Sequence, residues 1–266
     1  MKYQVGFIGC GNMASAIIGG LINQYGMAPN EIIAADVSKA AVDNAKEQLK
    51  ISVTGDNLEV VKNSEVIFLS VKPQYYEDVI SKIKDSISKE QLIITIAPGK
   101  TLEWLMERLG SDKKIVRTMP NTPALVGEGI TGVCKNVNVT DEDFDKAMKL
   151  LSSFGLAEAI PESLMDVCVS VSGSSPAYVF MFIEAMADAA VADGMPRNQA
   201  YKFAAQAVYG SAKMVLETGK HPGELKDMVC SPAGTTIEAV RVLEEKGFRS
   251  SVIEAMKACT KKAKGL

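Results

Sequence analysis

The sequence contains a single histidine, His221, and no closely spaced pair of cysteines. Its five cysteines are too far apart for a CxxC metal or redox motif, and one histidine cannot build a histidine-rich metal centre. An odd number of thiols, with no secretory leader recognisable at the start, favours free cysteines in a reducing compartment. We therefore expect a cytoplasmic protein with no metal site.

Strong charge of one sign is also missing, because the formal net charge is only -3 and the basic residues are spread along the chain. Nucleic acids and anionic membranes both select basic surfaces. No window shows the apolar length that a membrane-spanning helix needs. We therefore expect neither a nucleic-acid nor a membrane partner. With 266 residues, 47% of them hydrophobic, the chain has room for two globular domains.

The first part of the chain alternates short apolar runs with amphipathic stretches, a pattern that predicts a parallel α/β sheet. The runs are almost wholly apolar, as expected of strands covered on both faces. The predicted strands are 5–8, 32–35, 51–53, 66–71, 92–96 and 114–118. The predicted helices between and after them are 13–24, 39–50, 75–87, 102–109 and 141–154.

Beyond Pro161 this alternation stops and long helical stretches take over. The predicted helices there are 176–193, 197–217, 233–246 and 248–262. The first of them is apolar almost all round, so we expect it to be buried on most sides, in a core or a subunit interface. The change of pattern predicts a second, all-helical domain at residues 162–266.

The first strand runs directly into Gly9-Cys10-Gly11-Asn12-Met13-Ala14, a G-x-G-x-x-A turn that opens a helix. In such a turn Gly9 allows the tight bend, Gly11 lets the backbone approach a pyrophosphate, and Ala14 lets helix and strand pack closely. Asp36 closes the second strand, where an acid can accept hydrogen bonds from ribose hydroxyls. Residues 1–161 are therefore predicted to form a Rossmann-type dinucleotide-binding domain, with Asp36 favouring NADH and NADPH tolerated.

Three further strands end in turn-forming residues. Val71-Lys72-Pro73, Ala97-Pro98-Gly99 and the run from Met119 to Pro123, which contains Asn121, follow the fourth, fifth and sixth strands. Ligands of open α/β sheets bind outside the carboxyl ends of the strands. Proline can simply stop a strand, but three such loops at one edge favour a binding cleft, with Asn121 among its contacts.

The second half carries two turns rich in small residues, Ser172 to Tyr178 and Ser231 to Thr236, each placed just before a predicted helix. Backbone N–H groups and hydroxyls at a helix start suit a carboxylate, although ordinary helix capping uses the same residues. No lysine occurs between Lys149 and Lys202, so the base that hydroxyl oxidation requires is missing. Reduction of a C=N bond needs less, because a protonated imine already accepts hydride.

Together these segments resemble bacterial pyrroline-5-carboxylate reductases, which catalyse the last step of proline biosynthesis. The resemblance covers essentially the whole chain, and its most specific part is Ser231-Pro232-Ala233-Gly234-Thr235-Thr236 within residues 226–248. It implies that the helical domain binds substrate and dimerises by intertwining with its partner, and that dimers can form a larger ring. The active site would then combine the cofactor cleft of one subunit with helices of the other.

The resemblance also implies roles for individual residues. Ile8 to Met13 would hold the pyrophosphate, and Asn57 would lie near the adenosine end. Around the ribose and nicotinamide it places Val71, Lys72, Pro73 and Ala97. Thr235 and Thr236 would bind the substrate carboxylate through backbone N–H, with the Thr236 hydroxyl near the ring nitrogen. Glu162, Ser174 and Ser175 are further candidates at the substrate pocket.

Some alternatives stay open at this point. Family members often carry small or hydroxyl residues where this chain has Ala35 and Asp36, so the resemblance leaves the choice between NADH and NADPH open, although Asp36 itself favours NADH. A reductase of a related cyclic imine acid fits the same turns. A nicotinamide-sensing binding protein without turnover fits the absence of a sharp acid–base residue. A hydroxyacid dehydrogenase is disfavoured by the missing lysine.

Overall fold

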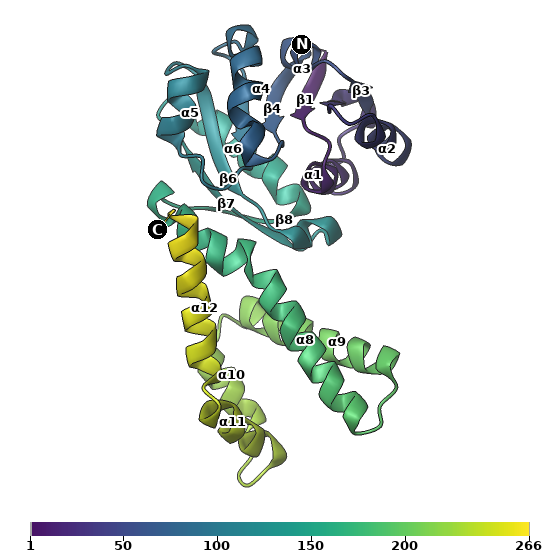
Figure 1. The fold of residues 1–266 in the computed structure, drawn as a ribbon, viewed down its shortest axis with the longest axis vertical. Helices are drawn as coiled ribbons and strands as arrows, with labels where there is room; N and C mark the ends of the chain where they lie inside the picture. The colour runs from purple at the N-terminus through teal and green to yellow at the C-terminus, as the bar shows by residue number, and fades with distance from the viewer. Residues whose placement is uncertain (1, 266) are drawn as a thin grey trace. The chain divides into compact units, whose positions relative to one another are not determined.

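The computed structural model describes residues 2–265 and divides the chain into two compact units (Figure 1). The first unit comprises Met1–Ser174 together with Thr260–Leu266, and the second comprises Ser175–Cys259. Residues 162–174 therefore pack with the first unit, although the sequence pattern changes at Pro161. The functional division at residue 161 stays a prediction.

The first unit is built on one eight-stranded sheet with the order β3-β2-β1-β4-β5-β6-β7-β8. The strands are β1 (Tyr3–Ile8), β2 (Ile32–Ala35), β3 (Ser52–Thr54), β4 (Ser64–Leu69), β5 (Leu92–Thr95), β6 (Lys114–Met119), β7 (Gly129–Lys135) and β8 (Gly155–Ala159). The pairs from β3 to β6 are all parallel, which confirms the predicted parallel α/β sheet for these strands.

The last two strands correct the prediction. β7 pairs with β6 in the antiparallel direction, and β8 runs parallel to β7, so the sheet is mixed at this edge. Neither segment was predicted as a strand. Gly129 and Gly132 lower the strand propensity of β7, and only the partners from elsewhere in the chain make it a strand.

Helices cover both faces of the sheet and bury two separate cores (Figure 1). The helices are α1 (Asn12–Asn23), α2 (Lys39–Leu49), α3 (Asn57–Asn63), α4 (Tyr76–Ile83), α5 (Leu102–Leu109) and α6 (Asp141–Leu151). One core joins α1, α2 and α6 to the sheet, with Phe7 stacked on Phe68 at 4.7 Å. The other joins α3, α4 and α5, and includes Ile8. Successive strand residues thus serve opposite faces, as the pleat requires.

The chain leaves the sheet through a nearly continuous helix that contains a π segment. It passes through α7 (Met165–Cys168) and the π-helical residues Val169–Gly173 into α8 (Ser175–Ala192). This arrangement differs from the predicted turn at Ser172, because Ser174 N–H already donates to the Val169 carbonyl at 2.8 Å. Single π turns in α-helices occur frequently at functional sites.

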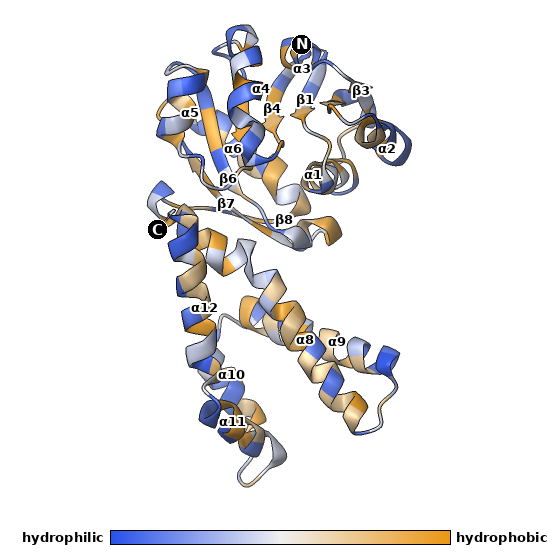
Figure 2. Ribbon diagram, viewed as in Figure 1, coloured by the Kyte–Doolittle hydropathy of each residue, from blue (hydrophilic) through white to orange (hydrophobic). Residues whose placement is uncertain are grey.

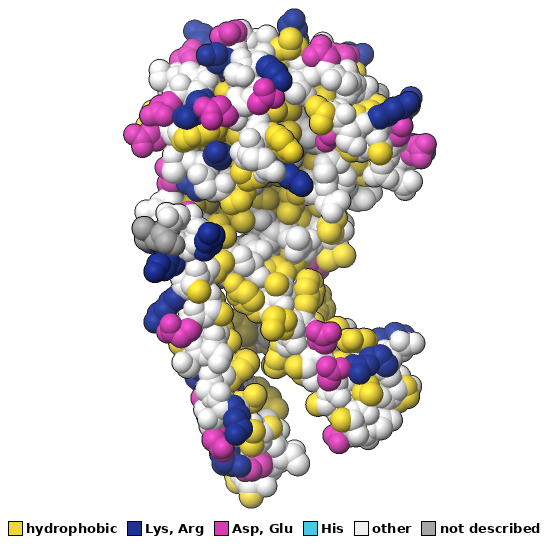
Figure 3. Space-filling model, viewed as in Figure 1, with side chains coloured by type: hydrophobic (Ala, Val, Ile, Leu, Met, Phe, Trp, Pro, Cys, Tyr) yellow, Lys and Arg dark blue, Asp and Glu magenta, His cyan; other side chains and the backbone are white. Residues whose placement is uncertain are grey.

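The second unit contains α8, α9 (Arg197–Thr218), α10 (Pro222–Val229), α11 (Thr235–Glu245) and most of α12 (Phe248–Ala263). We expected α8 to be buried on most sides, but only Pro176 and Ala187 are buried along it. Figure 2 shows α8 as largely hydrophobic, and Figure 3 shows hydrophobic side chains gathered over α8 and α9. Phe180 and Met181 are 62% and 69% exposed. Within one chain, α8 therefore lacks the cover that its sequence predicts.

The same helix corrects a second expectation. By length and composition, Glu162–Ala192 is one helix in the described part of the chain that could cross a membrane, with mean hydropathy 1.3 and 11% of its apolar window buried. Pro176 and the serines before it interrupt the sequence pattern, whereas the structure runs through them as helix. One such helix is weak evidence for a membrane, since the interface helix of a homo-oligomer has the same composition.

Candidate active site

The turn after β1 is tight because two other chain segments press against it. Gly9 has φ +105°, and a Cβ there would lie 2.7 Å from the backbone oxygen of Ser70, so only glycine fits. Gly9 N–H donates to the Ala35 carbonyl at 2.7 Å. The turn is thus fixed between the ends of β2 and β4.

The N-terminus of α1 is open and carries no acidic residue of its own in the first turn. Gly11 is its N-cap, and no side chain caps the helix. A Cβ built on Gly11 meets nothing within 4 Å. The first N–H groups of a helix lack intrahelical partners and carry the positive end of its dipole. The helix start at Gly11, Asn12 and Met13 therefore fits a pyrophosphate, whereas the side chain of Ile8 is buried in the core. Cofactor contact by Ile8 to Met13 stays a prediction.

Asp36 connects the end of β2 to this turn. Its carboxylate accepts hydrogen bonds from the backbone N–H of Cys10 and of Ser38, both at 2.8 Å. Burial, reinforced by the charge of Asp36, raises the pKa of the Cys10 thiol to about 12. Cys10 therefore stays a neutral thiol near pH 7, and its backbone N–H, rather than its sulfur, contributes to the turn.

The other predicted cofactor residues follow neighbouring strands at the same carboxyl edge. Val71, Lys72 and Pro73 come after β4, Ala97 after β5 and Asn121 after β6. Lys72 is exposed, Val71 and Pro73 are half-buried, and Ala97 is 3% exposed. The strand order reverses at β1, which lies between β2 and β4. This switch point is where open α/β sheets bind their ligands.

Asn121 and Asn57 occupy different kinds of position. Asn121 is 8% exposed, and its side chain donates to the Ser172 carbonyl at 3.1 Å and accepts from Ile130 N–H at 2.9 Å. It therefore ties the loop after β6 to the π segment. Asn57 is half-buried as the first residue of α3, capped by Asp56, beyond the end of β3. Cofactor contact by either residue stays a prediction.

One carboxylate oxygen of Glu162 has two partners within the first unit. Its Oε1 accepts from the backbone N–H of Leu102 at 2.7 Å and from the Arg117 guanidinium at 2.8 Å. Arg117 is 5% exposed on β6, whereas the Glu162 side chain is 34% exposed, so the ion pair is partly buried. Glu162 thus anchors the start of the long helix to the sheet, and a role at the substrate pocket stays a prediction.

Thr235 and Thr236 begin α11 in the second unit, on a turn that contains strained backbone. Ala233 has φ +57°, an uncommon value for a residue with a side chain. A Cβ on Gly234 would lie 2.3 Å from the Ser231 hydroxyl oxygen, so a larger residue there would displace that side chain. Gly234 is the N-cap and offers no side chain, which leaves the N–H groups of the first turn to a ligand.

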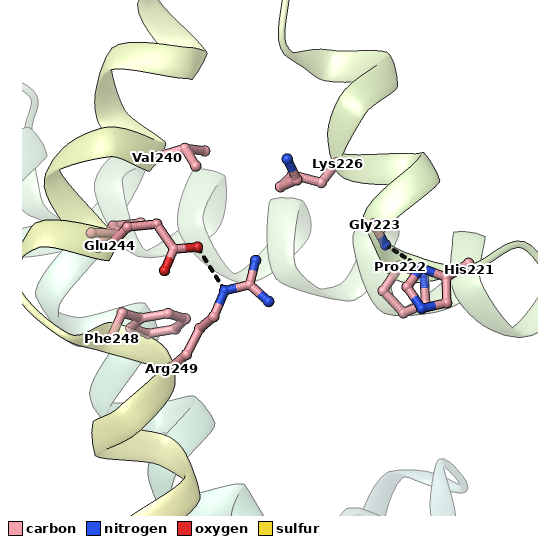
Figure 4. A pocket seen from close by; sticks show the side chains of 9 residues that line it. His221, Pro222, Gly223, Lys226, Val240, Glu244, Phe248 and Arg249 are labelled. Atoms are coloured by element: carbon pink, nitrogen blue, oxygen red, sulfur yellow. Dashed lines mark hydrogen bonds and ion pairs between the residues drawn. The ribbon is translucent and has the colours of Figure 1, made fainter.

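A cavity of about 520 Å³ lies among α10, α11 and α12 (Figure 4). His221 and Lys226 line one side, and Phe248 and Arg249 line the other. Arg249 Nε donates to Glu244 at 2.6 Å, so that cation is already paired. None of the predicted site residues lines this cavity.

Sequence reasoning missed the hydroxyl groups that join the strand ends at the cofactor edge. Ser70 Oγ donates to the Gly9 carbonyl at 2.8 Å, and the buried Tyr76 hydroxyl donates to the Leu69 carbonyl at 2.5 Å. The available signal was a hydroxyl residue placed at the end of a buried strand. That signal is too common to single these residues out.

The doubly wound sheet, the open α1 N-terminus and the loops at the switch point define a nicotinamide-dependent oxidoreductase. Two family models match the chain. One, described as NADP oxidoreductase coenzyme F420-dependent, matches residues 4–99, and one described as pyrroline-5-carboxylate reductase dimerisation matches residues 162–266. The chain belongs to the pyrroline-5-carboxylate reductase family.

Full-length relatives support this membership. The chain is 56% identical over 266 residues to a pyrroline-5-carboxylate reductase of Escherichia coli strain K12, covering 100% of this chain and 99% of the relative. It is 44% identical to one of Methanosarcina acetivorans, covering 99% and 97%. A solved reductase of Coxiella burnetii superposes with TM-score 0.91 at 36% identity, covering 100% and 98%. One of Plasmodium falciparum with NADP bound gives 0.90 at 33%, with the same coverage.

Proposed function

We propose that this chain reduces 1-pyrroline-5-carboxylate to L-proline with NADH or NADPH, the last step of proline biosynthesis. The observation that carries the proposal is the open, uncapped N-terminus of α1 in a chain that matches these reductases from end to end. A second helix start without a capping side chain, at Thr235, supplies a place for a carboxylate.

When bound, the nicotinamide supplies the hydride that adds to the imine carbon. The protein holds the pyrophosphate at the backbone N–H groups around Gly11, while the Asp36 carboxylate keeps the turn in position. Val71, Lys72, Pro73 and Ala97 are proposed to line the ribose and nicotinamide at the ends of β4 and β5. Fixed backbone donors at a helix start need no rearrangement to receive phosphate.

The substrate carboxylate is proposed to bind the N–H groups of Thr235 and Thr236. Glu238 also lies in the first turn of α11, but Arg241 pairs with it at 2.7 Å and offsets its charge. The Thr236 hydroxyl would then lie near the ring nitrogen, which carries a proton while the imine accepts hydride. Ser174 and Ser175, beside the π segment, are proposed as further contacts.

The assembly and the compartment belong to the same proposal. A homodimer, or a larger assembly of dimers, covers the apolar side chains that α8 leaves exposed. In it, the helical unit of a second copy supplies Thr236 to the cofactor edge of the first. The absence of a disulfide among the described cysteines and the charge of -3 fit a cytoplasmic enzyme without a nucleic-acid or membrane partner.

The direct test is the loss of NADH or NADPH absorbance when 1-pyrroline-5-carboxylate is added to the purified protein. Both cofactors and a six-membered analogue are assayed in parallel. We expect turnover of the five-membered imine with both cofactors. Turnover of the six-membered analogue alone would show that the substrate is a different cyclic imine acid. Cofactor binding without any turnover would identify a sensing protein.

Thr236→Ala tests the substrate side of the proposal. We expect kcat to fall roughly ten- to a hundredfold while the dissociation constant of the cofactor is unchanged, because one hydrogen bond to the ring nitrogen is lost. Thr235→Ala is the matched control, since it retains the backbone N–H and should keep kcat within about twofold. Wild-type kcat and kcat/KM in Thr236→Ala would reduce this residue to a structural part of α11.

A further inference from the structure

Side-chain hydrogen bonds connect the ends of the strands that lead into the proposed cofactor loops. Between β2 and β1, the Asp36 carboxylate accepts from Cys10 N–H at 2.8 Å. Between β1 and β4, Ser70 Oγ donates to the Gly9 carbonyl at 2.8 Å and to the Ile8 carbonyl at 3.1 Å. These bonds lie where the strand ladder ends and backbone groups must find other partners.

Similar hydrogen bonds connect the ends of β4, β5 and β6, on the proposed nicotinamide side of the switch point. The Tyr76 hydroxyl, on α4, donates to the Leu69 carbonyl at 2.5 Å and lies 3.0 Å from the Thr95 hydroxyl. Leu69 and Thr95 are register partners at the ends of β4 and β5. Thr118 Oγ1 on β6 then donates to the Thr95 carbonyl at 2.8 Å. Among these hydrogen-bonded residues, Tyr76 is the one that comes from a helix rather than from a strand.

Tyr76 is 1% exposed, so its hydroxyl has no access to bulk water. Burial raises the pKa of Tyr76 well above its ordinary value, and the group remains a hydrogen-bond donor at any working pH. A buried hydroxyl destabilises a protein unless it is hydrogen-bonded, and phenylalanine would fill the same space without that requirement. The role of the hydroxyl is therefore to hold the ends of β4 and β5 in position, in addition to filling space in the core.

We infer that Tyr76 is a positioning residue for the nicotinamide half of the cofactor. Its hydroxyl fixes the ends of β4 and β5, and the loops that carry Val71, Pro73 and Ala97 continue directly from those ends. The ladder between β4 and β5 holds the rest of each strand without it. Loss of the hydroxyl should thus disturb the loops more than the fold. The inference rests on the proposed function.

The test compares Tyr76→Phe with Tyr75→Phe, in which the neighbouring, 55% exposed tyrosine loses the same atom. In Tyr76→Phe we expect the dissociation constant of NADH, measured by its fluorescence without imine, to rise about three- to tenfold. We expect kcat to fall about tenfold with the KM for the imine within about twofold, because helix α11 binds that substrate. Tyr75→Phe should match the wild type in all three.

Thr95→Val gives an independent variant, because it removes the hydroxyl next to Tyr76 while keeping the shape and β-branching that a strand favours. The double variant should bind NADH no more weakly than Tyr76→Phe alone, because Tyr76→Phe already removes the contact between the two hydroxyls that Thr95→Val would break. Unchanged NADH affinity and kcat in both single variants, with only a lower Tm, would overturn the inference. If the wild type bound NADH without reducing the imine, the proposed function would fail, yet the binding comparison would still decide the role of Tyr76.

Discussion

At the scale of single residues, Asp36 has two tasks that the sequence does not separate. Its carboxylate holds Cys10 and Ser38 through their backbone N–H groups, and it also stands where the adenosine ribose is proposed to lie. A 2′-phosphate there would bring a charge of about -1.5 to -2 toward the carboxylate. Lys39, which is exposed at the start of α2, offsets that repulsion by about 0–1 kcal/mol. We therefore expect NADH to be used well and NADPH to be tolerated.

Replacing Asp36 with serine should shift the kcat/KM ratio toward NADPH by about tenfold, equivalent to roughly 1.4 kcal/mol. Because the phosphate turn loses a hydrogen bond too, kcat/KM for NADH should fall, and the ratio rather than either value is the measure. Asp43→Ser removes an exposed acid further along α2 and should leave the ratio unchanged. A strong wild-type preference for NADPH that survives Asp36→Ser would mean that Asp36 serves the turn alone.

At the scale of elements, the start of α1 is the part of the cofactor site that the structure defines most sharply. Gly11 has φ -68° and ψ -178°, extended backbone that any residue adopts, and a Cβ there meets no protein atom within 4 Å. The glycine is therefore dispensable for folding. Its small size matters only for what approaches the helix start from outside.

Gly11→Val should for that reason separate folding from binding. We expect a Tm close to that of the wild type and a dissociation constant for NADH about a hundredfold higher, equivalent to roughly 2.7 kcal/mol. The control is Gly19→Val further along α1, where a Cβ also meets nothing within 4 Å. Wild-type NADH affinity in a folded Gly11→Val protein would show that the phosphates lie elsewhere.

At the scale of the whole molecule, the helical unit carries more apolar surface than a single chain covers. The exposed large hydrophobic residues of α8 are Val179, Phe180, Met181 and Phe182. A contiguous exposed apolar surface of this kind marks an interaction site. Because residues 162–266 match a dimerisation family, a second copy of the chain is the partner that fits.

Light scattering should accordingly give a mass of at least twice the 28.5 kDa of the chain. Phe180→Glu places a charge on the 62% exposed face of α8 and should yield monomers that bind NADH but reduce the imine at least about tenfold more slowly. Gln48→Glu adds one charge to an exposed position on α2 and should leave both mass and activity unchanged. Fully active monomers of Phe180→Glu would refute a site shared between subunits.

The sequence by itself determined the features that depend on local pattern. Apolar runs of strand length gave β1, β2, β4, β5 and β6 close to their observed bounds, and the G-x-G-x-x-A run located the uncapped helix start that is proposed to receive phosphate. Family signatures in the turn before Thr235 identified the substrate class. These inferences succeed because hydrophobic period and glycine stereochemistry act over a few neighbouring residues.

Only the tertiary structure decided features that join distant residues. β7 is a strand, and antiparallel, because β6 is there to pair with it, while Ser174 follows a π turn rather than a free helix start. The partners of Asp36, Tyr76 and Glu162 lie 26, 7 and 60 residues away along the chain, at the ends of other elements. Hydrogen bonds of this kind follow from where the strands end in space, and no periodicity in the sequence encodes that position.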